Sequence, residues 1–186
     1  GNEDNPYLVL VKAKNNSITS CEINKNTKLV FEDAFRFAKL TNVIIPDGII
    51  SIGKNAFNFK SLKYSEYDNG CYLGNEENPY LVFAKAKDRS ITNCVINENT
   101  RIICGSAFYD CKQLENVEIS NNIVSICDGA FEYCTSLESI IIPDSVKRIG
   151  VYAFSNCRNL KSIAIPNSVT LIEDKAFYEC VNLSSV

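Results

Sequence analysis

The chain has 186 residues, of which 46% are hydrophobic and 22% charged, which is typical of one folded domain or one elongated repeat array. Its formal net charge of −3 offers no basic field for nucleic acid or anionic lipid. Histidine is absent, which excludes Ser-His-Asp and Cys-His catalysis and histidine-ligated zinc.

The chain opens with a segment that recurs later. Residues 1–35 match residues 74–108 at a constant offset of 73 positions. Both copies contain Asn-Pro-Tyr-Leu-Val, Lys-Ala-Lys and Ser-Ile-Thr in this order. The second copy begins inside a predicted hairpin, so we interpret the start of the chain as the second half of such a hairpin.

Two short repeats follow, with Ala-Phe at 34–35 and 56–57. Apolar residues alternate with polar ones ahead of Pro46, which predicts a short strand with one buried face. A proline suits the end of such a strand better than its middle.

The third repeat is interrupted. It starts at Leu62 but has Ser65 and Tyr67 where aliphatic residues are expected. Asp-Asn-Gly at 68–70 is a strong turn signal, and Gly-Asn-Glu-Glu-Asn-Pro at 74–79 is another. Apolar stretches lie between and after these turns, so residues 68–89 predict an inserted β-hairpin that projects from one coil or extends its edge.

From residue 91 the repeat is regular, with Ala-Phe every 23 residues from 107–108 to 176–177. Residues 137–157 read Leu-x-x-Ile-x-Ile-Pro-x-x-Val-x-x-Ile-x-x-x-Ala-Phe-x-x-Cys. We interpret this unit as a short strand, a second extended segment, and a tight turn or single helical turn whose Phe fills the interior. One unit cannot bury its own apolar residues, so neighbouring units must stack.

This pattern resembles the BspA-like leucine-rich repeat family, also called the Treponema pallidum type, and covers nearly the whole chain outside the hairpin. The resemblance implies a leucine-rich repeat solenoid of about seven coils of 22–23 residues, mainly β with short helical turns and a parallel sheet on one face. We expect a single domain over residues 1–186, cut mid-repeat at both ends, with the hairpin at 68–89. Family members are often cell-surface or secreted proteins, and the better-studied ones are linked to adhesion.

Nine cysteines are the least ordinary part of the composition. Cys111, Cys134, Cys157 and Cys180 share one repeat position, so stacking predicts a column of thiols. Small buried hydrophobic residues are the favoured interpretation. Disulfides within the column fit the bridge dihedral poorly, and zinc lacks a Cys-x-x-Cys pair. Cys71 lies off the repeat positions, and we expect it to be the most exposed.

The outward positions of the sheet strands are the default ligand surface. They are small and mostly neutral, and the alternative is an unused solvated face. On the strands of the successive coils these candidates are Asn42, Ile44, Asn93, Val95, Asn116, Glu118, Ser139, Ile141, Ser162 and Ala164.

The hairpin supplies a second set of candidate contacts, which are Tyr72, Tyr80, Lys85 and Lys87. The favoured alternative for its aromatic residues is packing against the flank of the solenoid. Carboxylates at the turns, such as Asp68, are interpreted as solvated turn residues and not as a catalytic pair.

These features together favour a non-catalytic interaction module that binds a protein or glycan partner, with a structural spacer as the alternative. An enzyme on a parallel solenoid needs clustered Asp, Lys and Arg on successive coils, which the repeats do not supply. We expect no cofactor, no nucleic-acid partner and no membrane insertion, because no apolar run approaches about 18 residues. The resemblance implies a cell-surface or secreted location, with an intracellular one as the alternative.

Overall fold

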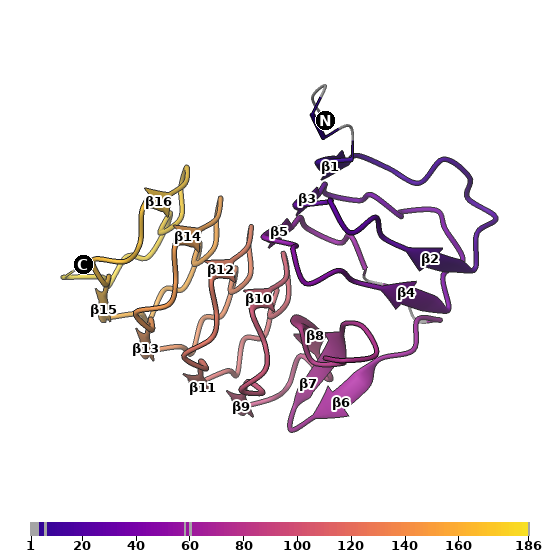
Figure 1. The fold of residues 1–186 in the computed structure, drawn as a ribbon. Coiled ribbons are helices and arrows are strands. Elements are labelled where there is room, and N and C mark those ends of the chain that lie inside the picture. The colour runs from indigo at the N-terminus through magenta and orange to yellow at the C-terminus, as the bar shows by residue number, and fades with distance from the viewer. Residues whose placement is uncertain (1–3, 6, 58, 60, 186) are drawn as a thin grey trace.

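The computed structural model describes residues 4–5, 7–57, 59 and 61–185, so both ends of the expected domain lie outside the described residues. The chain winds into about seven stacked coils (Figure 1). Each regular coil contributes one strand to each of two opposite sides, which we call the front and the rear. The predicted solenoid is therefore confirmed.

The front strands are three residues long and carry the apolar alternation that the sequence predicts. In β13 (Ser139–Ile141), Ile140 is buried while Ser139 and Ile141 are exposed. The turn after it begins at a proline, since Val146 N–H donates to the carbonyl of Pro143 at 3.0 Å. The other front strands are β2 (Ser20–Glu22), β4 (Asn42–Ile44), β9 (Asn93–Val95), β11 (Asn116–Glu118) and β15 (Ser162–Ala164).

The rear strands are the second extended segment of each repeat. They pair parallel in register one repeat apart, as Ile103 with Ile126 and Ile126 with Ile149. Parallel ladders thus lie on both sides of the coil and not on one face alone. The rear strands are β1 (Val9–Leu10), β3 (Leu29–Val30), β5 (Ser51–Ile52), β8 (Val82–Ala86), β10 (Ile102–Ile103), β12 (Ser125–Ile126), β14 (Arg148–Ile149) and β16 (Leu171–Ile172).

The Ala-Phe segments are turns, as the tight-turn alternative predicts, and the described residues contain no helix, so the short helical turns are not present there. The amide of Phe131 donates at 2.7 Å to the carbonyl of Ala153 in the next coil, where a helix would need a partner four residues back. Residues two positions before and after the Phe also have left-handed backbones, as Tyr152 (φ 56°) and Asn156 (φ 59°) do around Phe154. A right-handed helix cannot continue through such residues.

The repeat phenylalanines fill the interior, as predicted. Their rings are stacked in adjacent coils, with centroids 4.9 Å apart for Phe108 and Phe131 and 5.1 Å for Phe131 and Phe154. Phe83 of β8 continues the column at 4.6 Å from Phe108, and Phe35 with Phe57 forms a second short column at 5.4 Å.

The insertion is an antiparallel three-stranded unit made of β6 (Ser65–Tyr67), β7 (Gly70–Leu73) and β8. The predicted hairpin is confirmed as β7 and β8, which pair antiparallel with an irregularity between Cys71 and Tyr72. β8 also pairs parallel with β10, so the hairpin joins the rear sheet and does not merely project from it.

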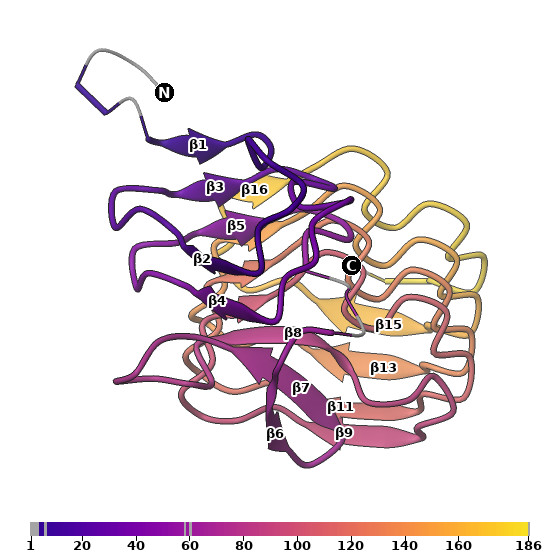
Figure 2. The same ribbon diagram turned by 90° about the vertical axis from the view of Figure 1, so that its right-hand side faces the viewer.

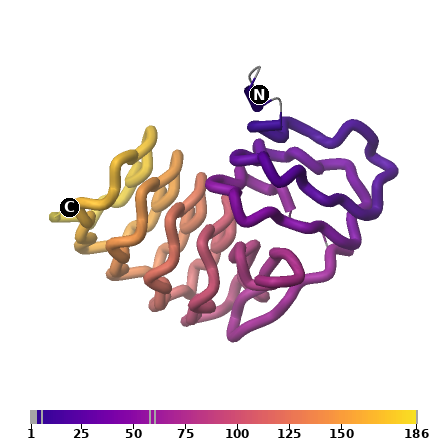
Figure 3. Tube along the Cα trace, in the orientation of Figure 1, coloured from indigo at the N-terminus to yellow at the C-terminus, as the bar shows by residue number. Residues whose placement is uncertain are grey.

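The insertion divides the coils into an N-terminal stack, residues 7–57, and a C-terminal stack, residues 91–185. The two stacks lie at an angle to each other, with the insertion on the outside of the bend (Figures 1 and 3). The junction is close: Gly105 N–H donates to the Ile52 carbonyl at 2.9 Å, and Lys54 Nζ lies 2.7 Å from Glu132 Oε2. A Cβ on Gly105 would lie 2.5 Å from the Lys54 backbone nitrogen, so this approach needs glycine.

Candidate binding surface

The front strands β9, β11, β13 and β15 lie one above another on one side of the C-terminal stack (Figure 2). Alternation along a strand sends the first and third residues away from the core. Eight of the ten candidates are exposed, and Ile44 and Val95 are half-buried. In register, Asn93 lies beside Asn116 and Ser139 beside Ser162.

A groove of about 440 Å³ runs across β9, β11 and β13. It spans the junction between two ladders, because β11 pairs with β9 whereas β13 pairs with β15. Ile141 stands at its border with 84% of its surface exposed. The candidate residues that line this groove are Asn93, Val95, Asn116, Glu118, Ser139 and Ile141.

The structure does not bring all the candidates together. Asn42 and Ile44 line a separate hollow of about 300 Å³ between β4 and the insertion. Ser162 and Ala164 lie one coil beyond the lining of the main groove. The front face is therefore two surfaces, separated where the insertion interrupts the coils.

Asp68 is a residue of the groove that sequence reasoning missed. Its carboxylate oxygen Oδ2 accepts a hydrogen bond from the Val95 amide at 2.8 Å, and its backbone is left-handed at φ 47°. Next to it, Asn69 Nδ2 donates to the Asn93 carbonyl at 2.9 Å. The Asp-Asn-Gly signal located this turn in the sequence. Its docking onto β9 depends on the path of β6 and β7, which the turn signal does not contain.

Most of the candidate contact residues of the hairpin instead make contacts that stabilise the insertion. Tyr72 is fully buried, so its assignment as a surface contact is wrong, and the alternative of packing against the solenoid holds for it. Its ring meets the half-buried Tyr80 at 5.5 Å, and the Asn97 amide donates to its hydroxyl at 3.2 Å. The Lys85 ammonium lies 4.6 Å from the Tyr64 ring centroid, and Lys87 pairs with the exposed Glu66 at 3.0 Å.

Three thiols of the predicted cysteine column, those of Cys111, Cys134 and Cys157, are buried, and the fourth, Cys180, is half-buried. From Cys134 on, each thiol of the column donates to the carbonyl of a repeat phenylalanine one coil back, as Cys157 does to Phe131 at 3.1 Å. Burial raises the pKa of the Cys111 thiol to about 11 and that of Cys94 to about 12. These thiols stay protonated at neutral pH and are poor nucleophiles.

The expectation that Cys71 is the most exposed thiol is wrong. It lies on β7, the strand between β6 and β8, with 8% of its surface exposed. The less buried thiols are those of Cys21 and Cys180, in outer coils of the two stacks. Among the described residues no cluster of Cys, Asp and Glu could hold a metal ion.

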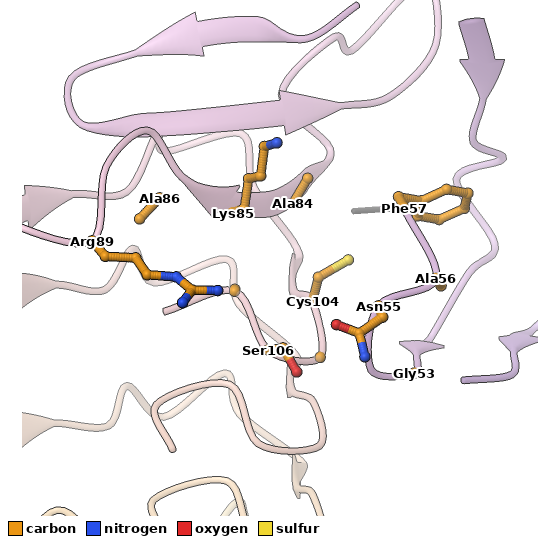
Figure 4. Close-up of a pocket in the computed structure, with 12 residues that line it drawn as sticks. Gly53, Asn55, Ala56, Phe57, Ala84, Lys85, Ala86, Arg89, Cys104 and Ser106 are labelled. Atoms are coloured by element: carbon orange, nitrogen blue, oxygen red, sulfur yellow. The ribbon is translucent and has the colours of Figure 1, made fainter. Parts of the chain in front are cut away.

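A smaller cavity of about 80 Å³ lies at the junction of the stacks. Figure 4 shows Lys85, Arg89 and Cys104 reaching it from the β8 and β10 side, with Asn55 and Phe57 opposite. Full burial raises the pKa of the Cys104 thiol. A buried thiol that stays protonated is a poor nucleophile.

The repeat pattern of the chain matches the BspA type leucine-rich repeat region in six copies, over residues 13–76 and 82–186. The chain belongs to this family. No curated protein matches the chain. Among the described residues, none forms a helix long and apolar enough to cross a membrane.

Solved leucine-rich repeat structures share the fold of this BspA-type chain. The leucine-rich repeat protein of T. pallidum is 20% identical, with a TM-score of 0.51 over 96% of this chain and 62% of its own. A leucine-rich cell surface protein of Faecalibacterium prausnitzii is 23% identical, with a TM-score of 0.54 over 91% and 59%. The pneumococcal vaccine antigen PcpA is 17% identical, with a TM-score of 0.50 over 89% and 55%. The chain thus spans about three fifths of the length of these structures.

Proposed function

We propose that this BspA-type repeat domain is a non-catalytic module that binds a partner protein through the groove across β9, β11 and β13. The observation that carries the proposal is Ile141, an aliphatic side chain 84% exposed beside a groove of about 440 Å³. A single exposed aliphatic residue is ordinary on a protein surface. Ile141, however, lines the groove together with the amide of Asn116 and the hydroxyl of Ser139, which can form hydrogen bonds with a partner that buries Ile141.

The charges around the groove favour a partner with basic residues. Asp68 and Glu118 both line it, and it has no Lys or Arg in its lining. Like charges in a partner would be repelled and opposite charges attracted, which affects association rates most strongly at low salt. A role at the cell surface or outside the cell is part of the proposal, supported by the descriptions of the F. prausnitzii protein and the pneumococcal antigen.

The experiment compares two exposed aliphatic residues. The 186-residue chain is tested against a panel of purified extracellular proteins and a glycan array, together with the variants Ile141→Asp and Val181→Asp. Val181 is 67% exposed and lies outside the groove, so it is the matched control. We expect Ile141→Asp to weaken binding of a panel protein at least about tenfold, and Val181→Asp to change it less than about twofold.

Three outcomes would contradict the proposal. If Ile141→Asp left the binding of a panel protein unchanged, that protein would have to bind at a surface other than this groove. A chain that binds no panel member would favour the alternative, a structural spacer that holds other parts of a protein apart. Binding restricted to the glycan array would replace the protein partner by a carbohydrate.

A further inference from the structure

A cleft of about 440 Å³ lies between the rear strands of the two stacks. Figure 1 shows these strands on the inner side of the bend, opposite the insertion. One wall comes from the coils of β3 and β5, and the other from the coils of β12 and β14. β3 pairs with both β1 and β5, and β14 pairs with both β12 and β16, so each wall includes a strand from the interior of its sheet.

The surface of this cleft is mostly apolar and includes an aromatic ring from each stack. Phe31 directly follows β3 and is 54% exposed. The register of β3 with β5 places Gly53 beside it in the next coil, so no side chain at that position covers the ring. Val151 and the half-buried Tyr152 line the opposite wall. Apolar clefts of this volume with a few polar groups are typical of small-ligand sites.

The charged side chains of the cleft are unevenly paired. Arg148 Nη2 lies 2.7 Å from Asp128 Oδ1 and also contacts Glu173 Oε2, so one guanidinium group faces two carboxylates. Lys54, which lines the same cleft, pairs with Glu132 at 2.7 Å. The Lys54 pair is therefore neutral, whereas the group around Arg148 has an excess of negative charge.

Glu32 adds a further negative charge. Its side chain lines the cleft next to Phe31, and it forms no ion pair with any of the described residues. The ammonium group of Lys175 lies 5.5 Å from the Tyr152 ring centroid and offsets one of the carboxylates, so the balance stays negative. A cation is therefore attracted to this cleft and an anion is repelled. Apolar surroundings strengthen both effects.

We propose that the cleft between the two stacks binds a small organic cation that carries an aromatic ring. The ring would pack against Phe31 and Val151, one on each wall, and the cationic group would lie toward Glu32 and Asp128. An aromatic ligand gains from contact with the exposed Phe31 ring beyond the apolar area that it buries. This site is separate from the groove across β9, β11 and β13, because the two share no lining residue.

The probe is 2-phenylethylammonium, titrated into the 186-residue chain and followed by NMR of the backbone amides. The matched control is 3-phenylpropionate, which has the same ring and linker but a carboxylate in place of the ammonium group. We expect saturable binding of the cation and at least about tenfold weaker binding of the anion. The amides of Phe31 and Val151 should both shift, because they lie on opposite walls, and that of Val181 should not.

Variants of the chain locate the binding. Phe31→Ser removes the exposed ring and should weaken binding of the cation about tenfold or more. Phe37→Ser is its control, because that ring is 69% exposed but lies outside the cleft, and it should change binding less than about twofold. Glu32→Gln keeps the shape of the side chain and removes its charge, so it should weaken the cation at least about threefold without weakening 3-phenylpropionate.

The proposal would be overturned by the absence of saturable binding, or by equal affinities for the cation and the anion. Binding that Phe31→Ser or Glu32→Gln leaves unchanged, or amide shifts on one wall only, would overturn it as well. The groove variant Ile141→Asp should bind the probe normally, so this test is separate from that of the proposed function.

Discussion

At the scale of single residues, the repeat phenylalanines form a continuous column of stacked rings through the C-terminal stack. Their burial could be predicted from the 23-residue spacing, because one apolar aromatic per coil must point inward when coils stack. The backbone around them could not. Tyr133 and Tyr152 adopt left-handed conformations that tyrosine disfavours, and hydrogen bonds to the neighbouring coil hold the turn in this form.

Phe131→Ala tests the phenylalanine column. The ring is fully buried between Phe108 and Phe154, so its removal leaves a cavity that stacked coils cannot close. We expect a loss of about 3–5 kcal/mol in the free energy of unfolding, measured by urea denaturation. Phe37→Ala is the control, since that ring is 69% exposed, and it should cost less than about 0.5 kcal/mol. A cost below that value for Phe131→Ala would place the ring outside the core.

At the scale of strands and columns, the sequence predicts the elements that recur in every repeat. It does not predict all the elements in the insertion, where the repeat pattern is interrupted. Turn signals at 68–70 and 74–79 located β7 and β8. They did not reveal β6, because Ser65 and Tyr67 match neither a buried coil strand nor a clear hairpin strand by themselves. The exposed front-face residues followed from alternation, whereas the contribution of Asp68 to the groove required the three-dimensional path of the insertion.

The cysteine column predicts a loss of stability in alkaline solution. Burial raises the pKa of these thiols above the value of 9.0 for a free thiol, to about 11 for Cys111. Their stabilising contribution is complete below the pKa of the unfolded chain, because both states are then protonated. It is lost as pH rises from about 9 towards the folded pKa, since the unfolded state releases protons first.

Urea midpoints at pH 8 and pH 10.5 measure this effect. We expect a lower midpoint at the higher pH, and a smaller difference in Cys111→Ala, which has one thiol fewer to ionise on unfolding. Cys21→Ala is the control because its thiol is only half-buried. Equal midpoints at both pH values would show that the buried thiols do not couple to folding.

At the scale of the whole molecule, the bend between the two stacks depends on a close backbone contact. Repeat stability is a sum of coil and interface contributions, so a weakened interface separates the array into independently melting parts. The sequence predicted an interruption of the repeat at residues 62–89. It could not predict that β5 would lie against the coil containing Gly105, since these segments are not neighbours in the repeat order.

Gly105→Ala tests this junction. The added Cβ would lie 2.5 Å from the Lys54 backbone, so we expect a destabilisation of about 1–3 kcal/mol and earlier melting of the N-terminal stack. Hydrogen exchange resolves the two stacks, and β3 amides should lose protection before those of β12. Gly48→Ala is the control, because only the flexible end of Lys28 lies within 3 Å there. Equal destabilisation by Gly105→Ala and Gly48→Ala would show that the close contact at the junction does not contribute to the stability of the array.

β1 and β8 lie 73 positions apart and pair in the same way with the following coil, Val9 with Leu29 and Val82 with Ile102. This correspondence bears on how the array gains or loses repeats in evolution. Residues one offset apart have the same strand register and the same hydrogen bonds to the following coil. Recombination between two such units therefore joins backbone to backbone in phase, and inserts or deletes a pair of coils together with their hairpin. Each exchange also adds or removes one bend. A longer array would therefore be a series of stacks joined at angles and not one straight rod.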